Sequence, residues 1–170
     1  MPKLDFLPEG GRIPKGEHLK RKVELLLLTN DAVIALTDVY TGTSPRDFES
    51  ATEARIKMRE WVGNEDRFHP HAAQYEFEAW LFPYWSRIQT LAGSNRTAPS
   101  STPEGVNHNK PPSRHLEEVF RTGRKKRAYS KVRDAAAILR DQDLSIAAAS
   151  CSELKAFLNT ILTLSGSPNL

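Results

Sequence analysis

Apolar and polar positions follow two different periods along the first part of the chain. Between residues 16 and 29, Leu19, Val23 and Leu27 recur at the spacing of one helical face. Residues 31–38, DAVIALTD, are instead a short unbroken apolar run that ends in a carboxylate, which is typical of a strand in a parallel sheet. The pattern therefore predicts a helix over 16–29 followed by a strand.

A second helix is predicted after a short loop. Ser44 has the character of an N-cap, Pro45 suits the first helical position, and Asp47 completes the spacing of a capping box. The apolar periodicity continues to Val62, and Gly63 with its neighbouring asparagine ends it. We therefore expect this helix to run to about Val62.

The stretch 68–82, FHPHAAQYEFEAWLF, begins as a predicted strand and turns helical at YEFEAWLF. Its aromatic residues, continued by Tyr84 and Trp85, predict a buried core, because a base-stacking platform would need exposed rings. Residues 93–112 are rich in Ser, Pro, Gly and Asn and predict a long polar loop.

Three further helices are expected over residues 113–121, 129–140 and 152–164. The order of helix, strand, helix, strand and then helices predicts an α/β fold with a small, mainly parallel sheet flanked by helices and a helical C-terminal part. A chain of 170 residues is about one domain long. We therefore expect a single domain over residues 1–170.

Positive charge is concentrated in one segment of the chain. Residues 114–133 carry eight basic and two acidic side chains, whereas the net charge of the whole chain is only +3. Clustered Lys and Arg side chains bind nucleic acid by releasing the counterions of its phosphates. The candidate contacts with nucleic acid are Lys110, Arg124, Lys125, Lys126, Arg127 and Lys131. A solvated helix connector is the alternative interpretation.

Three carboxylates form a candidate metal site. Asp38 ends the first predicted strand, and Glu76 and Glu78 follow the second. In a parallel sheet both strand ends lie at one edge, where Mg²⁺ or Mn²⁺ would neutralise converging carboxylates and generate hydroxide from water. In the alternative, Asp38 caps a turn and the glutamates are a solvated pair at a helix N-terminus. If residues 75–82 are helical, only Glu76 is expected to be a ligand.

Two other features suggest less about function. His69 and His71 share a face of the predicted strand, and packing is a better explanation for them than a metal clip, because Pro70 separates them and Cys151 is the only cysteine. The single cysteine favours a reducing cytoplasm. The N-terminus has no signal-peptide pattern, and no apolar run is long enough for a membrane span.

The residues together resemble a known family. DVYTG at 38–42, HAAQYEFEAWLF at 71–82 and Pro-Pro-Ser at 111–113 are similar to the bacterial domain-of-unknown-function family 4276 (DUF4276), which is grouped with TOPRIM-like domains. The resemblance extends from about residue 10 to the end, and its most specific part is the Glu-Phe-Glu-Ala block.

The resemblance implies metal-dependent phosphodiester chemistry in phage defence, beside an ATPase, with Asp38, Glu76 and Glu78 as the acidic residues. TOPRIM-like chains open with a strand and a Glu-Gly turn that carries a further catalytic glutamate. Here only one helix and the segment PKLDFLPEGG precede Asp38, so we expect that the first strand and helix are missing.

Three functions follow as hypotheses. The first is a Mg²⁺- or Mn²⁺-dependent nuclease-like domain that uses Asp38 and Glu76 for catalysis. The second is a non-catalytic partner module of an ATPase-containing complex. The third is a metal-dependent phosphatase or nucleotide hydrolase that lacks a Gly-rich phosphate loop.

Overall fold

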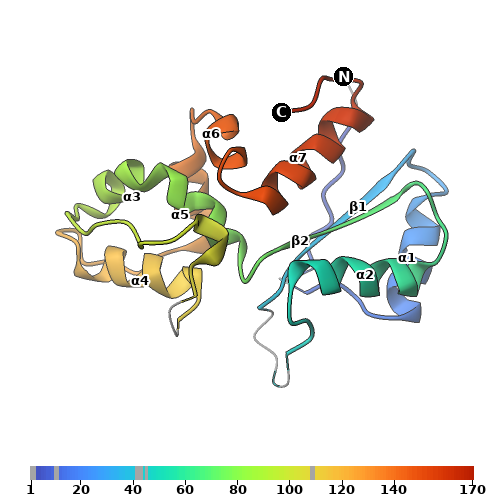
Figure 1. Ribbon diagram of the computed structural model, residues 1–170, viewed down its shortest axis with the longest axis horizontal. Coiled ribbons are helices and arrows are strands. Elements are labelled where there is room, and N and C mark those ends of the chain that lie inside the picture. The colour runs from blue at the N-terminus through green and yellow to red at the C-terminus, as the bar shows by residue number, and fades with distance from the viewer. Residues whose placement is uncertain (1–2, 10–11, 41–43, 45, 108–109) are drawn as a thin grey trace. The chain divides into compact units, whose positions relative to one another are not determined.

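The computed structural model describes residues 3–9, 12–40, 44, 46–107 and 110–170. The elements are α1 (Glu17–Leu26), β1 (Val33–Asp38), α2 (Ala51–Val62), β2 (Phe68–Ala73), the 3-10 helix η1 (Phe77–Tyr84), α3 (Trp85–Ala92), the 3-10 turn η2 (Pro103–Gly105), α4 (Pro112–Thr122), α5 (Lys131–Leu139), α6 (Leu144–Ala148) and α7 (Ser152–Leu164) (Figure 1). The fold is mixed α/β with a helical C-terminal part, as the sequence predicts.

The chain divides into two compact units. The first comprises Met1–Gln74 and Ala156–Leu170, and the second comprises Tyr75–Lys155. The backbone therefore passes between the units twice, once just after β2 and once inside α7. The presence of one domain over the whole chain stays a prediction.

The first unit is built on a two-stranded parallel sheet. Val33 of β1 lies opposite Phe68 of β2, and Asp38 lies opposite Ala73, so both strands end together. Figure 1 shows α1 and α2 on one face of these strands and α7 on the other. The face toward α1 and α2 carries the apolar core of the unit, in which Phe68 and Met58 are fully buried. The predicted parallel pairing is confirmed.

Helix α2 begins later than the sequence predicts. Its N-cap is Ser50, whose hydroxyl accepts a hydrogen bond of 3.1 Å from the backbone N–H of Glu53. The prediction of Ser44 as the cap and of Asp47 in the first turn is therefore wrong. The predicted position of Pro45 lies outside the described residues. Ser50 and Glu53 have the same capping-box spacing as Ser44 and Asp47. The sequence therefore offers two possible starts for this helix.

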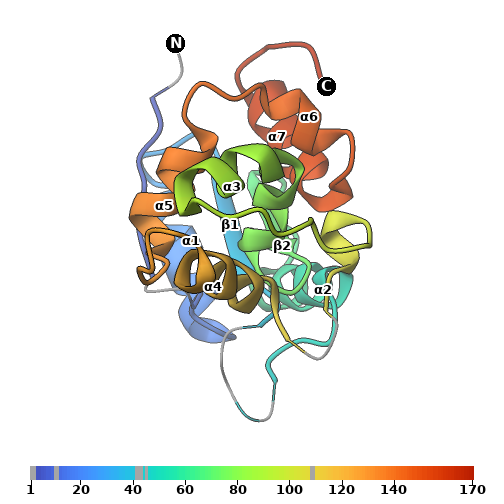
Figure 2. The ribbon, with the colours of Figure 1, turned by 90° about the vertical axis from the view of Figure 1, so that its left-hand side faces the viewer.

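The second unit packs helices around η1. The 3-10 helix contacts α4, α5, α6 and η2, and its residues Ala79 and Leu81 are almost completely buried. Figure 2 shows α3, α4 and α5 of this unit. The predicted helices over 113–121, 129–140 and 152–164 are confirmed as α4, α5 and α7.

The sequence patterns predict neither α3 nor α6. Helix α3 continues directly from the aromatic run of η1, in which nearly every position is apolar and no single face stands out, so no signal in the sequence marks the start of a separate helix. Helix α6 has only five residues, too few for a helical period to repeat. Both helices belong to the second unit.

Candidate functional site

Asp38 lies where the sequence places it, at the carboxyl end of β1. The ladder continues for one residue beyond it, because the N–H of Val39 donates to the carbonyl of Ala73 at 3.1 Å. Tyr40 then lies under the guanidinium of Arg46, 4.4 Å from its ring centroid. Asp38 is partly exposed.

Glu76 binds the N-terminus of α4. Its two carboxylate oxygens accept hydrogen bonds from Ser113, one from the backbone N–H at 2.7 Å and one from the hydroxyl at 3.0 Å. The N-cap position of α4 is Pro111, which has no polar side chain to accept these donors. Since free N–H groups at a helix N-terminus favour a carboxylate, Glu76 acts as a cap supplied from a distant part of the chain.

Glu78 is completely buried in η1. One of its carboxylate oxygens lies 3.4 Å from the ammonium nitrogen of Lys131, which in turn lies 4.7 Å from the centroid of the Phe77 ring. A buried carboxylate requires such a cation, because removal from water disfavours its charged form. Lys131 is thus a partner of Glu78 in the structure of the second unit.

Tyr129 lies in the same acidic surroundings. Burial raises the pKa of its phenol, and the carboxylates of Glu78, Asp134 and Glu76 raise that pKa further. The hydroxyl is buried and forms no hydrogen bond with the described residues. Tyr129 therefore stays protonated at neutral pH.

The three predicted metal ligands belong to different units. Asp38 is part of the first unit, whereas Glu76 and Glu78 are part of the second, so their convergence on one ion stays a prediction. Within either unit, the described residues contain no group of three or more His, Cys, Asp or Glu side chains suited to a metal. Mg²⁺ sites often use only one or two carboxylates. Glu76 and Glu78 could supply these, but an ion would compete with Ser113 and Lys131.

The histidines have structural surroundings. His71 is buried on β2, its Nε2 lies 2.9 Å from the hydroxyl of Thr160, and its ring meets Phe157 edge-on. Burial, together with the positive charges of Arg55 and His69, lowers the pKa of His71 to about 4. His71 is therefore neutral near pH 7 and packs in the core, as the sequence predicts.

The aromatic run is also core. Trp80, Phe82 and Tyr84 are each less than 10% exposed, and Trp85 is partly buried. The indole N–H of Trp80 donates to Glu104 at 2.9 Å. These rings pack inside the second unit and offer no stacking surface.

The predicted nucleic-acid contacts separate into two groups. Three of the six cations are held by carboxylates of the second unit: Lys131 by Glu78, Arg127 by Asp134 at 2.7 Å and Lys110 by Glu118 at 2.6 Å. Arg127 also lies over the Phe120 ring. The other three are Arg124, Lys125 and Lys126. Their side chains are exposed, and no acidic side chain in the described ranges pairs with them.

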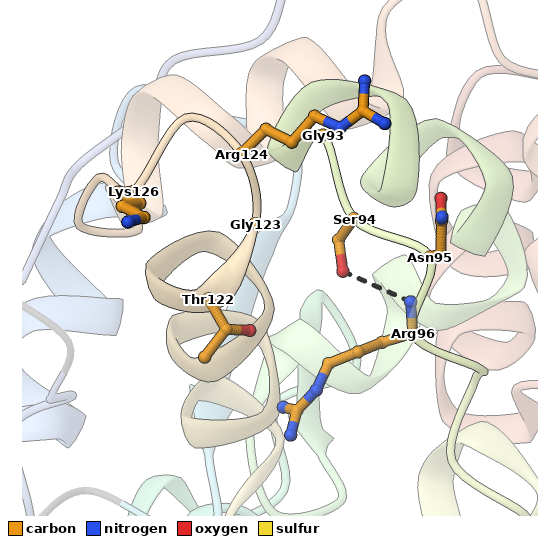
Figure 3. Close-up of a pocket in the computed structure, with 8 residues that line it drawn as sticks. All are labelled: Gly93, Ser94, Asn95, Arg96, Thr122, Gly123, Arg124 and Lys126. Atoms are coloured by element: carbon orange, nitrogen blue, oxygen red, sulfur yellow. Dashed lines mark hydrogen bonds between the residues drawn. The ribbon is translucent and has the colours of Figure 1, made fainter.

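Two of the exposed cations line a pocket of about 580 Å³ in the second unit (Figure 3). The pocket lies between the loop after α3 and the loop after α4. Its lining residues are Gly93, Ser94, Asn95, Arg96, Thr122, Gly123, Arg124 and Lys126. Sequence reasoning did not find Arg96, because it is a single cation within a long polar loop.

The family model described as a domain of unknown function (DUF4276) matches residues 8–162. The chain belongs to the DUF4276 family. No curated protein and no solved structure matches it.

The DUF4276 match spans Asp38, both glutamates and the whole basic segment, and it confirms the resemblance drawn from the sequence motifs. The TOPRIM-like grouping stays a prediction. None of the helices in the described part of this DUF4276 chain is long and apolar enough to cross a membrane.

Proposed function

We propose that this DUF4276 protein binds nucleic acid through Arg124, Lys125 and Lys126. The observation that carries the proposal is the contrast within one basic segment. Arg127 and Lys131 are neutralised by the nearly fully buried carboxylates of Asp134 and Glu78, whereas the three preceding cations project into solvent. Exposed like charges repel one another, so a polyanion stabilises such a cluster.

The energetic basis is the release of counterions from phosphates. Each phosphate that a cation neutralises adds about 0.9 to the slope of log K against log salt for duplex DNA and about 0.7 for a single strand. Three cations therefore predict a contribution of about 2–3 to this slope. Binding by the cluster should weaken steeply as salt rises.

The test measures binding of labelled DNA and RNA by fluorescence anisotropy at several salt concentrations. Replacing Arg124, Lys125 and Lys126 together with alanine should weaken binding at low salt and lower the slope by about 2–3. A control variant with alanine at Lys20, Arg21 and Lys155 removes the same charge elsewhere. Equal losses in both variants would show that only the net charge of the protein matters, and would exclude this interface.

A second candidate function is metal-dependent phosphodiester cleavage. Its support is the parallel pairing of β1 and β2, which puts Asp38 at a strand end where ligands commonly bind. Mg²⁺ or Mn²⁺ held by Asp38, Glu76 and Glu78 would activate water against a phosphodiester. The resemblance to TOPRIM-like domains and the proposed place in phage defence belong to this candidate.

Cleavage of DNA and RNA should then require Mg²⁺ or Mn²⁺ and should fall at least about tenfold in Asp38→Ala and in Glu76→Gln. The Glu76→Gln variant keeps an oxygen that can accept from Ser113. Ser113→Ala is the matched control, because it removes one partner of Glu76 and keeps the carboxylate. Cleavage that survives Asp38→Ala and Glu76→Gln unchanged would exclude this site. Absent cleavage, with stable co-purification of an ATPase, would favour the partner-module function instead.

A further inference from the structure

Two glycines allow the loops of the pocket to approach each other closely. A Cβ on Gly123 would overlap the carbonyl oxygen of Ala92, and a Cβ on Gly93 would lie 3.1 Å from the Cβ of Arg124. Gly93 also has a φ of +65°, which side chains disfavour, and its carbonyl accepts from the N–H of Arg124 at 2.9 Å. The glycines thus hold the two loops together at the base of the pocket.

The lining of the pocket is cationic. Arg96 comes from one loop, and Arg124 and Lys126 come from the other (Figure 3). The only carboxylate that contacts these three side chains in the described residues is that of Glu118, which Arg96 reaches at 2.9 Å and which Lys110 also neutralises. The hydroxyl of Ser94 accepts from the N–H of Arg96 at 3.3 Å and keeps its own proton to donate.

Lys126 has a strained backbone. Its φ is +39°, in the left-handed region where glycine and asparagine are preferred over lysine. Strained residues of this kind often occur at ligand sites, where the side chain matters more than the conformation. A lysine at this turn is explained if its charge has a ligand in the pocket.

We propose that this pocket binds a terminal phosphate of a nucleic-acid strand, a phosphomonoester. This inference rests on the proposed binding of nucleic acid and adds that the protein recognises the ends of strands. A phosphomonoester carries a charge of about −1.5 to −2 near neutral pH, whereas a phosphodiester within the strand carries a single negative charge. Three cations around one recess match the dianion better, and a strand end can enter a recess more readily than a continuous backbone can.

The experiment compares one internally labelled single-stranded DNA carrying a 5′-phosphate, a 3′-phosphate or only hydroxyl ends. At moderate salt, the native chain should bind at least one phosphorylated strand about tenfold more tightly than the hydroxyl strand, the gain of one charge-assisted contact. Inorganic phosphate, titrated separately by calorimetry, should bind the native chain and should compete away this gain.

Three variants assign the gain to the pocket. Lys126→Asn suits the positive φ, so the variant should be at least as stable as the native chain and should still lose the gain. Arg96→Gln should lose it too. The matched control is Lys125→Asn, which does not line the pocket and should weaken all three strands equally while the phosphate gain persists.

The outcomes separate this inference from the proposed function. Equal affinity for phosphorylated and hydroxyl strands would overturn the phosphate pocket and leave nucleic-acid binding intact. Failure of all strands to bind, with inorganic phosphate still bound and lost in Lys126→Asn, would uphold a phosphate pocket and overturn nucleic-acid binding. Failure of strands and of inorganic phosphate alike would overturn both.

Discussion

Individual side chains in this protein find their partners far away in the sequence. Glu76 contacts Ser113 across 37 positions, and His71 contacts Thr160 across 89. Such contacts determine whether a polar residue is available for chemistry. The sequence around Glu76 suits a metal ligand and a helix cap equally well, and only the position of α4 distinguishes them.

Stability in mild acid should depend on His71. Its pKa in the folded chain is about 4 and its ordinary value is 6.5. Between these values the unfolded chain binds a proton that the folded chain does not, so the free energy of unfolding falls as pH falls from 6.5 toward 4. The stabilising contribution of His71 is fully present above its ordinary pKa. Its complete loss would lower the free energy of unfolding by about 1–3 kcal/mol.

The variant His71→Gln removes the titrating group and keeps a side chain that can hydrogen bond with Thr160. Urea unfolding at several pH values should show a flatter dependence between pH 6.5 and pH 4 than in the native chain. His18 is exposed on α1, so His18→Gln is the control and should keep the native slope. An unchanged slope in His71→Gln would contradict a buried neutral imidazole.

At the scale of elements, the second unit caps its helices with carboxylates from other segments. Glu104, in the long polar loop, accepts from the hydroxyl of Ser152 at 3.0 Å and from the N–H of Glu153 at 3.0 Å, at the start of α7. Glu76 does the same for α4. The segment predicted as a loop therefore anchors a helix, because a free N-terminus attracts any carboxylate that the fold brings near.

Elements with a strong apolar period could be predicted from sequence. Helix α7 has the predicted bounds, since its leucines and isoleucine repeat along one face through the whole helix. The start of α2 was predicted wrongly, because Ser44 and Ser50 carry the same local signal. A distant residue adds to the Ser50 cap in the structure, because the side-chain oxygen of Gln74 accepts from the N–H of Ala51 at 2.9 Å.

The candidate site shows the same limit. The sequence identifies the basic segment, but it does not distinguish the cations that pair with buried carboxylates from those that face solvent. Lys131 meets Glu78 only when α5 packs on η1, and Arg127 meets Asp134 only when the turn before α5 folds back on that helix. Arg96 lines the pocket because Gly93 and Gly123 let the loops after α3 and α4 approach closely. No local pattern in the sequence indicates this approach.

At the scale of the whole molecule, two cores share one chain. The first unit is closed by the C-terminal residues, whereas the second is continuous in sequence from Tyr75 to Lys155. Helix α7 begins in the second and ends in the first. Stability in proteins is often divided among such compact parts, which open separately. A perturbation deep inside one unit therefore tests whether the two cores unfold independently.

Asp134 offers that perturbation, because it is 1% exposed in the second unit. Its carboxylate accepts hydrogen bonds of 2.7 Å from Arg127 and from the N–H of Ser130, and a further one from Arg133. Burial alone would raise the pKa of this carboxyl, but these hydrogen bonds outweigh burial and lower the pKa to about 2. Asp134→Asn leaves Arg127 without its anion and should destabilise the second unit by about 2–4 kcal/mol.

Amide hydrogen exchange then reports where the loss is felt. Exchange in α4 and α5 should accelerate, whereas exchange in β1 and α2 should stay close to native, because those elements have their own core. Helix α7 provides an internal comparison, since its first residues should follow α5 and its last residues should follow β2. Equal acceleration in all elements would mean that the two units unfold as one, and would support a single cooperative domain over the whole chain.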